Sequence, residues 1–211
     1  NGITENMDWQ EAMEALNCTN VGVVARNAAA EDLARILIQA AGLDESCFTY
    51  VAVGIQPLPA LESNDTDWTV TFDPFQVFAV QTGLGINPFS IQRGEGPPGL
   101  DWPGLVYMTG RDTFDTRQDM LCAYKSGTVE AIAWLADPAN AEQAGEIAKT
   151  RLAEALHPLI PAIITKYQNA FSATGDIQFG QIETISQISV DVGKTDRLFA
   201  ANEVAQDLDC E

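Results

Sequence analysis

Residues 20–42 read NVGVVARNAAAEDLARILIQAAG, and this stretch decides the fold class. The compact apolar run Val21–Val24 is typical of a buried strand. Asn27 is a suitable N-cap, and the acidic residues of the next turn suit the positive end of a helix dipole. Apolar residues then recur at helical spacing up to Gly42, a typical C-terminal glycine. The stretch therefore predicts a strand that leads through Asn27 into a helix.

The same alternation continues along the chain. Phe48–Val53 and Trp68–Phe72 are predicted strands, and residues 58–63 and 75–82 are predicted helices that follow them. Strands and helices that alternate over short connections form a parallel sheet with right-handed crossovers. This part of the chain therefore predicts an α/β fold with helices on both faces of the sheet, which makes three layers.

The second half of the chain has a different pattern. Proline and glycine are frequent between residues 88 and 103, which predicts a crossing segment instead of a regular element. Leu105–Met108 is one more predicted strand, and the rest is mostly helical. Predicted helices cover residues 116–136, 141–155, 158–170, 182–192 and 201–208. A single strand cannot form a sheet, and amphipathic helices need a surface to cover.

The sequence divides into four regions. They are a polar lead-in (1–17), an α/β lobe (18–90), a crossing or hinge segment (91–104) and a mostly helical part (105–211).

The charge excludes some classes of partner. Thirty acidic residues against eleven basic ones give a formal net charge of −19. Such a field repels nucleic-acid phosphates and anionic membrane surfaces, so we expect no nucleic-acid binding. An anionic small molecule is not excluded, because local dipoles at a pocket can outweigh a distant surface charge.

The four cysteines predict two disulfides and an oxidising compartment. Cys18 and Cys47 each come just before a predicted strand, and neighbouring parallel strands would bring them close together. Cys122 lies early in a long predicted helix, and Cys210 lies near the C-terminus, where a cross-link would tether the tail. We therefore predict the pairs Cys18–Cys47 and Cys122–Cys210.

Four stretches in order carry a resemblance to a known family. They are NVGVVARNAAAEDL (20–33), AGLDESCFTYVAVG (41–54), ALES followed by DWTVTFDPF (60–75), and AYKSGTVEAIAWLADPANAEQA (123–144). The chain resembles the periplasmic solute-binding proteins of ABC importers for nitrate, sulfonates, taurine and thiamine-pyrimidine precursors.

The resemblance implies a type II periplasmic-binding-protein-like fold, with two hinged lobes that close on a ligand. Residues 18–90 would be the second lobe, and residues 105–211 the returning, helix-rich part of the first lobe. The part that usually begins the first lobe has no counterpart here. The expected partners are an ABC permease and either a missing N-terminal segment or a second chain that completes the first lobe.

The function that the resemblance implies is transport without chemistry and without a cofactor. The ligand would be a small nitrogen- or sulfur-containing organic molecule: a sulfonate, taurine, a pyrimidine precursor or an aromatic carboxylate. The protein would act in the periplasm or outside the cell, after removal of a signal peptide, and a lipid-anchored precursor is compatible with this.

The best ligand-binding candidate is the turn formed by Arg26, Asn27, Ala28 and Ala29. The end of a strand that leads into a helix N-terminus presents backbone N–H groups, and small residues let a ligand approach closely. The simpler alternative is an ordinary capped helix without a ligand.

Other candidates follow the remaining strands. Gln56 follows the second strand, while Asp73 and Phe75 follow the third, where Asp73 could accept a hydrogen bond and Phe75 could stack on a ring. Asp73 could equally cap the next helix, with the following proline at the first helical position. Tyr107 and Trp102 flank the crossing segment, where they could contact a ligand or simply pack.

Two other classes of protein fit the sequence less well. A related pyrimidine synthase needs a lysine, histidines and a clustered cysteine motif that are not found here. His157, the only histidine, precedes a proline at a predicted helix start, and no nucleophile elbow, phosphate loop or metal-binding motif is present, so we expect neither an enzyme nor a metal site. The effector domain of a LysR-type regulator has a similar length, but it would be cytoplasmic, with reduced thiols.

Overall fold

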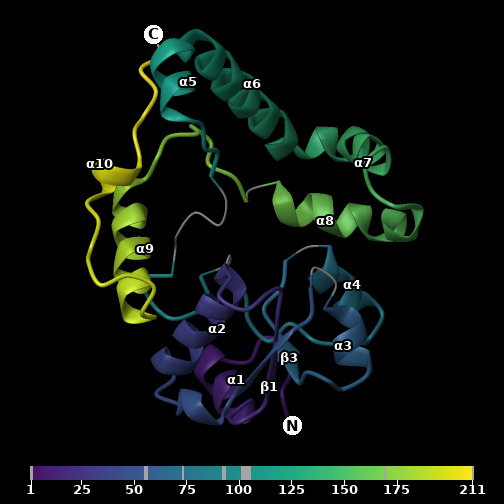
Figure 1. Ribbon diagram of the computed structural model, residues 1–211. Coiled ribbons are helices and arrows are strands. Elements are labelled where there is room, and N and C mark those ends of the chain that lie inside the picture. The colour runs from purple at the N-terminus through teal and green to yellow at the C-terminus, as the bar shows by residue number, and fades with distance from the viewer. Residues whose placement is uncertain are drawn as a thin grey trace. The chain divides into compact units, whose positions relative to one another are not determined.

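The computed structural model shows a mixed α/β chain that divides into two compact units (Figure 1). Unit 1 comprises residues 1–101 and 191–194, and unit 2 comprises residues 102–190 and 195–211. The structure describes residues 2–54, 57–72, 74–91, 94–100, 106–168 and 170–210. In this described part, no helix is both long and apolar enough to cross a membrane.

Unit 1 is built on a three-stranded parallel sheet. The strands are β1 (Asn20–Val23), β2 (Thr49–Ala52) and β3 (Trp68–Thr69), in the order β2-β1-β3. In the register of the sheet, Val21 lies opposite Tyr50 on one side and Trp68 on the other. Because β1 is central, its valines Val21 and Val23 are fully buried. The predicted parallel α/β arrangement is confirmed.

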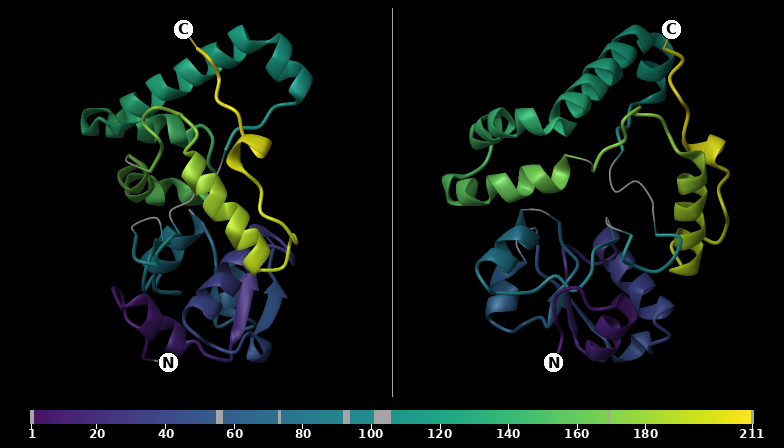
Figure 2. Two further views of the ribbon diagram at one scale, coloured as in Figure 1. Left: turned by 90° about the vertical axis from the view of Figure 1, so that its left-hand side faces the viewer. Right: turned by 180° about the vertical axis from the view of Figure 1, so that it is seen from behind.

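The helices of unit 1 lie on both faces of this sheet (Figures 1 and 2). The chain crosses from β1 to β2 in one direction and from β2 back past β1 to β3 in the other. Crossovers of the same hand in opposite directions place their helices on opposite faces. The elements are α1 (Trp9–Ala15), α2 (Ala29–Ala40), the 3-10 helix η1 (Glu45–Cys47), α3 (Leu58–Glu62) and α4 (Phe75–Gln81).

Unit 1 has a continuous apolar core. Met13 of α1 and Ile38 of α2 are fully buried, as are the central valines of β1. In α2, the buried residues Ala34, Leu37 and Ile38 recur at helical spacing, and so the helix turns one apolar stripe toward the interior. Gly22 in β1 is closely approached: a β-carbon there would lie 3.2 Å from the side chain of Thr69.

Unit 2 is helical in its described part. Its elements are α5 (Arg111–Thr116), α6 (Gln118–Ala136), η3 (Pro138–Asn140), α7 (Ala141–Lys149), η4 (Glu154–Leu159), α8 (Ile160–Tyr167), α9 (Phe179–Asp191, whose last residue belongs to unit 1) and α10 (Ala201–Val204). Helices α7 and α8 lie side by side in Figures 1 and 2. They approach closely at Gly145, where a β-carbon would lie 3.4 Å from Ile160.

The predictions for unit 2 are wrong in several places. The predicted helix 141–155 ends at Lys149 as α7, and the predicted helix 201–208 ends at Val204 as α10. Residues 106–108 of the predicted strand Leu105–Met108 form neither strand nor helix, because no described strand lies beside them to supply ladder hydrogen bonds. The predicted helix 116–136 begins later, since α5 and α6 are separated at Arg117, whose φ of −131° and ψ of 36° are not helical.

Both predicted disulfides are present. Cys18 and Cys47 are cross-linked in unit 1, with their Cα atoms 4.7 Å apart. Cys122 of α6 is cross-linked to Cys210 in unit 2, with a Cα–Cα distance of 5.5 Å. The second cross-link fastens the C-terminal tail to α6.

Candidate functional site at the N-terminus of helix α2

The turn between β1 and α2 differs from the expected cap in one respect. The N-cap is Ala28, with φ −96° and ψ 165°, and it has no side chain to accept a hydrogen bond. Asn27, the predicted N-cap, precedes it in a left-handed conformation with φ 61°. The prediction is wrong because a residue of the helix replaces the cap: Glu31 reaches back and accepts the Asn27 N–H at 2.8 Å.

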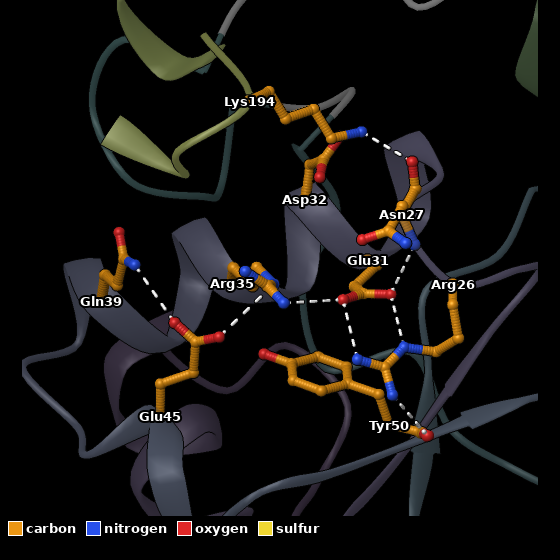
Figure 3. Close-up of polar contacts among 9 residues, drawn as sticks. All are labelled: Arg26, Asn27, Glu31, Asp32, Arg35, Gln39, Glu45, Tyr50 and Lys194. Carbon is orange, nitrogen blue, oxygen red and sulfur yellow. Dashed lines mark hydrogen bonds and ion pairs between the residues drawn. The ribbon is translucent and has the colours of Figure 1, made fainter. Parts of the chain in front are cut away.

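Glu31 is the centre of a buried ion cluster (Figure 3). Its side chain is only 1% exposed. One carboxylate oxygen, Oε2, accepts from Arg26 Nε at 2.7 Å, and the other, Oε1, accepts from Arg35 at 2.8 Å. A carboxylate removed from water needs such charged donors, because an unpaired buried charge is strongly unfavourable.

These contacts set the ionisation of Glu31. Burial by itself would raise the pKa of its carboxyl group. The hydrogen bonds from Arg26, the Asn27 N–H and Arg35 together outweigh burial and lower the pKa to about 2. In turn, the hydrogen bond to Glu31 raises the pKa of Arg26. Glu31 is therefore a fixed negative charge at any ordinary pH.

Tyr50 of β2 forms the floor of the cluster. The guanidinium carbons of Arg26 and Arg35 lie 5.2 and 5.6 Å from the centroid of its ring, within cation–π range. Burial, with the nearby charge of Glu45, raises the pKa of Tyr50 to about 12. Arg35 Nε also lies 3.3 Å from Glu45 Oε1, an ion pair without hydrogen-bond geometry.

A lysine from a distant part of the sequence completes the turn (Figure 3). Lys194, in the short segment 191–194 of unit 1, places its Nζ 2.7 Å from the backbone oxygen of Asn27 and 2.7 Å from a carboxylate oxygen of Asp32. This position, between a carbonyl and a carboxylate at the start of α2, accommodates an ammonium group.

The arrangement changes the chemistry expected of this turn. The Asn27 N–H and the guanidinium groups of Arg26 and Arg35 already donate to Glu31, and the neighbouring Lys194 ammonium is paired with Asp32. A bare anion would have to compete with two carboxylates of the chain itself. A ligand with an ammonium or amino group would have to displace Lys194 from the Asn27 carbonyl and the Asp32 carboxylate, but it would then meet acceptors that suit a cation.

The other predicted site residues are distributed over both units. Phe75 is the first residue of α4, where Pro74 precedes the helix instead of opening it, and its ring lies edge-on to Phe72 with centroids 5.9 Å apart. Phe75 follows β3 as the 26–29 turn follows β1, and so both lie at the carboxyl edge of one sheet. The predictions for Gln56, Asp73 and Trp102 lie outside the described residues.

Tyr107 belongs to unit 2 and lies against Tyr124 of α6. Their rings are edge to face, with centroids 5.1 Å apart, and the hydrogen bond between them raises the pKa of Tyr124. His157 lies in η4 with its Nε2 3.2 Å from the backbone oxygen of Leu152, a local contact typical of a structural histidine. Over the described residues, no group of three or more metal-ligating side chains is gathered.

Sequence reasoning missed the residues that organise the turn. The spacing of Glu31 and Arg35, four residues apart on one helix, is a detectable signal for an ion pair. The role of Lys194 has no local signal, because 167 residues separate it from Asn27.

Comparisons with protein-family models, with curated proteins and with solved structures give no match to this chain.

Proposed function

We propose that this chain is the ligand-recognising part of an extracytoplasmic solute-binding protein of an ABC importer. The observation that supports this most is the carboxyl edge of the parallel sheet, where the 26–29 turn and Phe75 follow neighbouring strands. Open α/β sheets bind ligands at this edge. The four ordered stretches between residues 20 and 144 support the same family.

The compartment and the mechanism form part of the proposal. Two disulfides are compatible with an extracellular location. The protein would have a type II binding-protein fold and act by hinge closure, in which ligand contacts favour the closed state over the open one. It would deliver the ligand to a membrane permease and perform no chemistry on it. A further segment or a second chain would complete the helical lobe.

The contacts at the turn favour one kind of ligand among the expected classes. Lys194 Nζ marks a position where the Asn27 carbonyl and the Asp32 carboxylate accept from a cation. Taurine and aminopyrimidines carry amino groups that could donate to the same acceptors, whereas nitrate carries none. An amino-bearing ligand that displaces Lys194 would find acceptors of the right kind, and on this ground we rank such ligands above bare anions.

Titration calorimetry tests the proposal on the intact chain. The ligand panel is taurine, an alkanesulfonate, nitrate, an aromatic carboxylate and an aminopyrimidine. We expect weak binding of the amino-bearing compounds, because the chain supplies only part of a cleft. Failure of the whole panel to bind would contradict the proposal.

Two variants of Ala28 test whether the turn is the site. Ala28→Asp places a carboxylate over the start of α2 and should weaken the binding of any anionic group. Ala28→Asn is the matched control, since both side chains can cap the helix and only one is charged. Equal affinities of the two variants would show that the ligand does not bind at this turn.

Thiol mapping separates this function from that of a LysR-type effector domain. Mass analysis of the native protein should find no reactive thiol at Cys18, Cys47, Cys122 or Cys210. Four free thiols would favour the cytoplasmic regulator instead.

A further inference from the structure

The sequence contains two copies of the three-residue motif that accepts an N-linked glycan. The motif is an asparagine, then any residue except proline, then a serine or a threonine. It occurs as Asn17-Cys18-Thr19 and as Asn64-Asp65-Thr66, and at no other asparagine of the chain. A motif this short also arises by chance, so its surroundings in the fold have to distinguish an acceptor from a coincidence.

The surroundings of Asn17 do not suit a glycan. The middle residue of its motif, Cys18, is cross-linked to Cys47. The side-chain oxygen of Asn17 lies 3.5 Å from the sulfur of Cys18 and 3.7 Å from that of Cys47, so the amide packs on the disulfide. The hydroxyl of Thr19 donates to the backbone oxygen of Leu16. Both polar side chains of this motif therefore have contacts within the fold.

Asn64 lies in the turn between α3 and β3 (Figure 1). It is exposed and has a left-handed φ of 60°, directly after Ser63, the C-cap of α3. Asparagine is common at this position, so the turn accounts for the residue type. The described residues form no hydrogen bond with its side-chain amide. A bulky group on that amide would extend into solvent without breaking a contact.

The hydroxyl group of Thr66 is not explained by the fold. The residue is only 3% exposed, and its Oγ1 is buried without a hydrogen-bond partner among the described residues. A buried hydroxyl without a partner is unfavourable, and valine would fill the same space without it. The glycosylation motif supplies a reason for the hydroxyl, because the transferase needs it while the chain is still extended.

An acidic residue stands two positions before Asn64. The stretch 62–66 reads ESNDT, and Glu62 is exposed. Oligosaccharyltransferases of the bacterial periplasm recognise an acidic residue at this position in addition to the motif, whereas those of eukaryotic cells do not need it. The corresponding residue before Asn17 is Ala15. Only the Asn64 motif therefore fits a transferase of the compartment that we propose for this protein.

We infer that Asn64 is the attachment site of an N-linked glycan, added by a periplasmic oligosaccharyltransferase from a lipid-linked oligosaccharide. The side-chain nitrogen of Asn64 forms a bond to the anomeric carbon of the oligosaccharide. The bond from that carbon to the lipid pyrophosphate breaks, the pyrophosphate leaves with the bonding electrons, and the amide proton passes to a base of the transferase.

The position of the turn is compatible with ligand binding. The turn precedes β3, and so it lies at the amino edge of the parallel sheet, whereas the 26–29 turn lies at the carboxyl edge. A glycan on Asn64 therefore leaves the candidate ligand site open. The inference rests on the extracytoplasmic setting of the proposed function, and not on its ligand.

Intact-mass analysis tests the inference on the full chain, exported to the periplasm of a bacterium that carries the transferase and its lipid-linked oligosaccharide. We expect the chain to gain the mass of one oligosaccharide, and fragmentation to place it on Asn64. Asn64→Gly suits the left-handed turn and should lose this gain while the circular dichroism spectrum stays unchanged. Asn17→Gln, the matched control at the other motif, should keep it.

Two further variants test how the motif is recognised. Thr66→Val keeps the shape of the side chain and removes the hydroxyl. It should abolish the mass gain and leave the melting temperature equal or higher, because the hydroxyl has no partner among the described residues. Glu62→Gln should lose the gain in the periplasm and keep it in a eukaryotic secretory host.

An exported chain without a glycan on Asn64 would overturn the inference. A Glu62→Gln chain that is still fully modified in the periplasm would overturn the assignment to a periplasmic transferase. Neither result bears on ligand binding, which calorimetry measures separately. Absence of ligand binding by a chain that carries a glycan on Asn64 would reject the proposed function and leave the glycosylation site standing.

Discussion

Unit 1 buries its apolar residues, whereas unit 2 displays them. Among the described residues, eleven of the buried apolar side chains lie in unit 1 and four in unit 2. Helix α2, with twelve residues, buries one stripe against the sheet, while α6, with nineteen, has no buried residue. Both helices contain many apolar residues. They differ in whether a neighbouring surface is available for those residues to pack against.

The difference shows that a sheet provides apolar faces against which helices can bury their side chains. A parallel sheet has two apolar faces that its crossover helices cover, so unit 1 closes a core from local units of strand and helix. Unit 2 has no described strand, and its helices pack in pairs such as α7 and α8. The Cys122–Cys210 cross-link adds a covalent constraint to this helical packing.

The largest effect should come from the disulfides. Cys122→Ser combined with Cys210→Ser opens a cross-link between residues 88 apart and should cost about 4–5 kcal/mol by loop-closure entropy. The control pair Cys18→Ser and Cys47→Ser, 29 residues apart, should cost about 3–4 kcal/mol. Urea denaturation measures both. A greater loss from the shorter loop would show that unit 2 is stabilised by packing after all.

A matched pair of core truncations compares the two units directly. Ile38→Ala in α2 removes a fully buried side chain and should lower the free energy of unfolding by about 3–4 kcal/mol. Ile132→Ala in α6 removes a half-buried one and should cost about 1 kcal/mol or less. The measurement is chemical denaturation at a concentration where the chain is monomeric. Equal costs would mean that α6 is covered within a single chain.

The ion cluster around Glu31 allows a comparison between a buried glutamate of unit 1 and an exposed glutamate of unit 2, and its effect on stability should depend on pH. Glu31→Gln should cost about 2–3 kcal/mol at pH 7, because Arg26 and Arg35 lose their shared partner. Glu130→Gln, at an exposed position of α6, is the control and should change stability by about 0.5 kcal/mol at most.

The sign of the pH effect follows from the lowered pKa of Glu31, about 2 against an ordinary value of 4.5. The unfolded chain binds a proton at Glu31 more readily than the folded chain does. Its stabilisation is therefore complete above about pH 5 and is lost as the pH falls toward 2. The gap between wild type and Glu31→Gln should close over this window in denaturation curves. A constant gap would contradict the cluster.

The smallest effect should be a gain. Ala28 has extended N-cap geometry without a capping side chain, so Ala28→Asn should stabilise unit 1 by about 1 kcal/mol. A rise in the melting temperature of unit 1 would confirm the cap position. A fall would indicate that Asn27, and not Ala28, caps α2 in solution.

The sequence by itself determined the elements whose signals are local. The apolar run at β1, the helical spacing of α2 and the closing glycine lie within 23 residues, and alternation of strands and helices was enough to predict a parallel sheet. The two disulfides were also predictable, because the cysteines stand at the ends of predicted elements whose positions the fold restricts.

Only the tertiary structure decided which elements pair and which side chains from distant parts of the chain come into contact. The pattern Leu105–Met108 predicts a strand, but a strand exists only where another strand lies beside it, and residues 106–108 have none among the described elements. Glu31 is one of the acidic residues that were expected to interact with the helix dipole. It instead accepts hydrogen bonds from Arg26 and from the Asn27 N–H, where an anionic ligand was expected. Lys194 reaches that turn from the far end of the chain. Such contacts depend on the path of the whole chain, and therefore no local pattern encodes them.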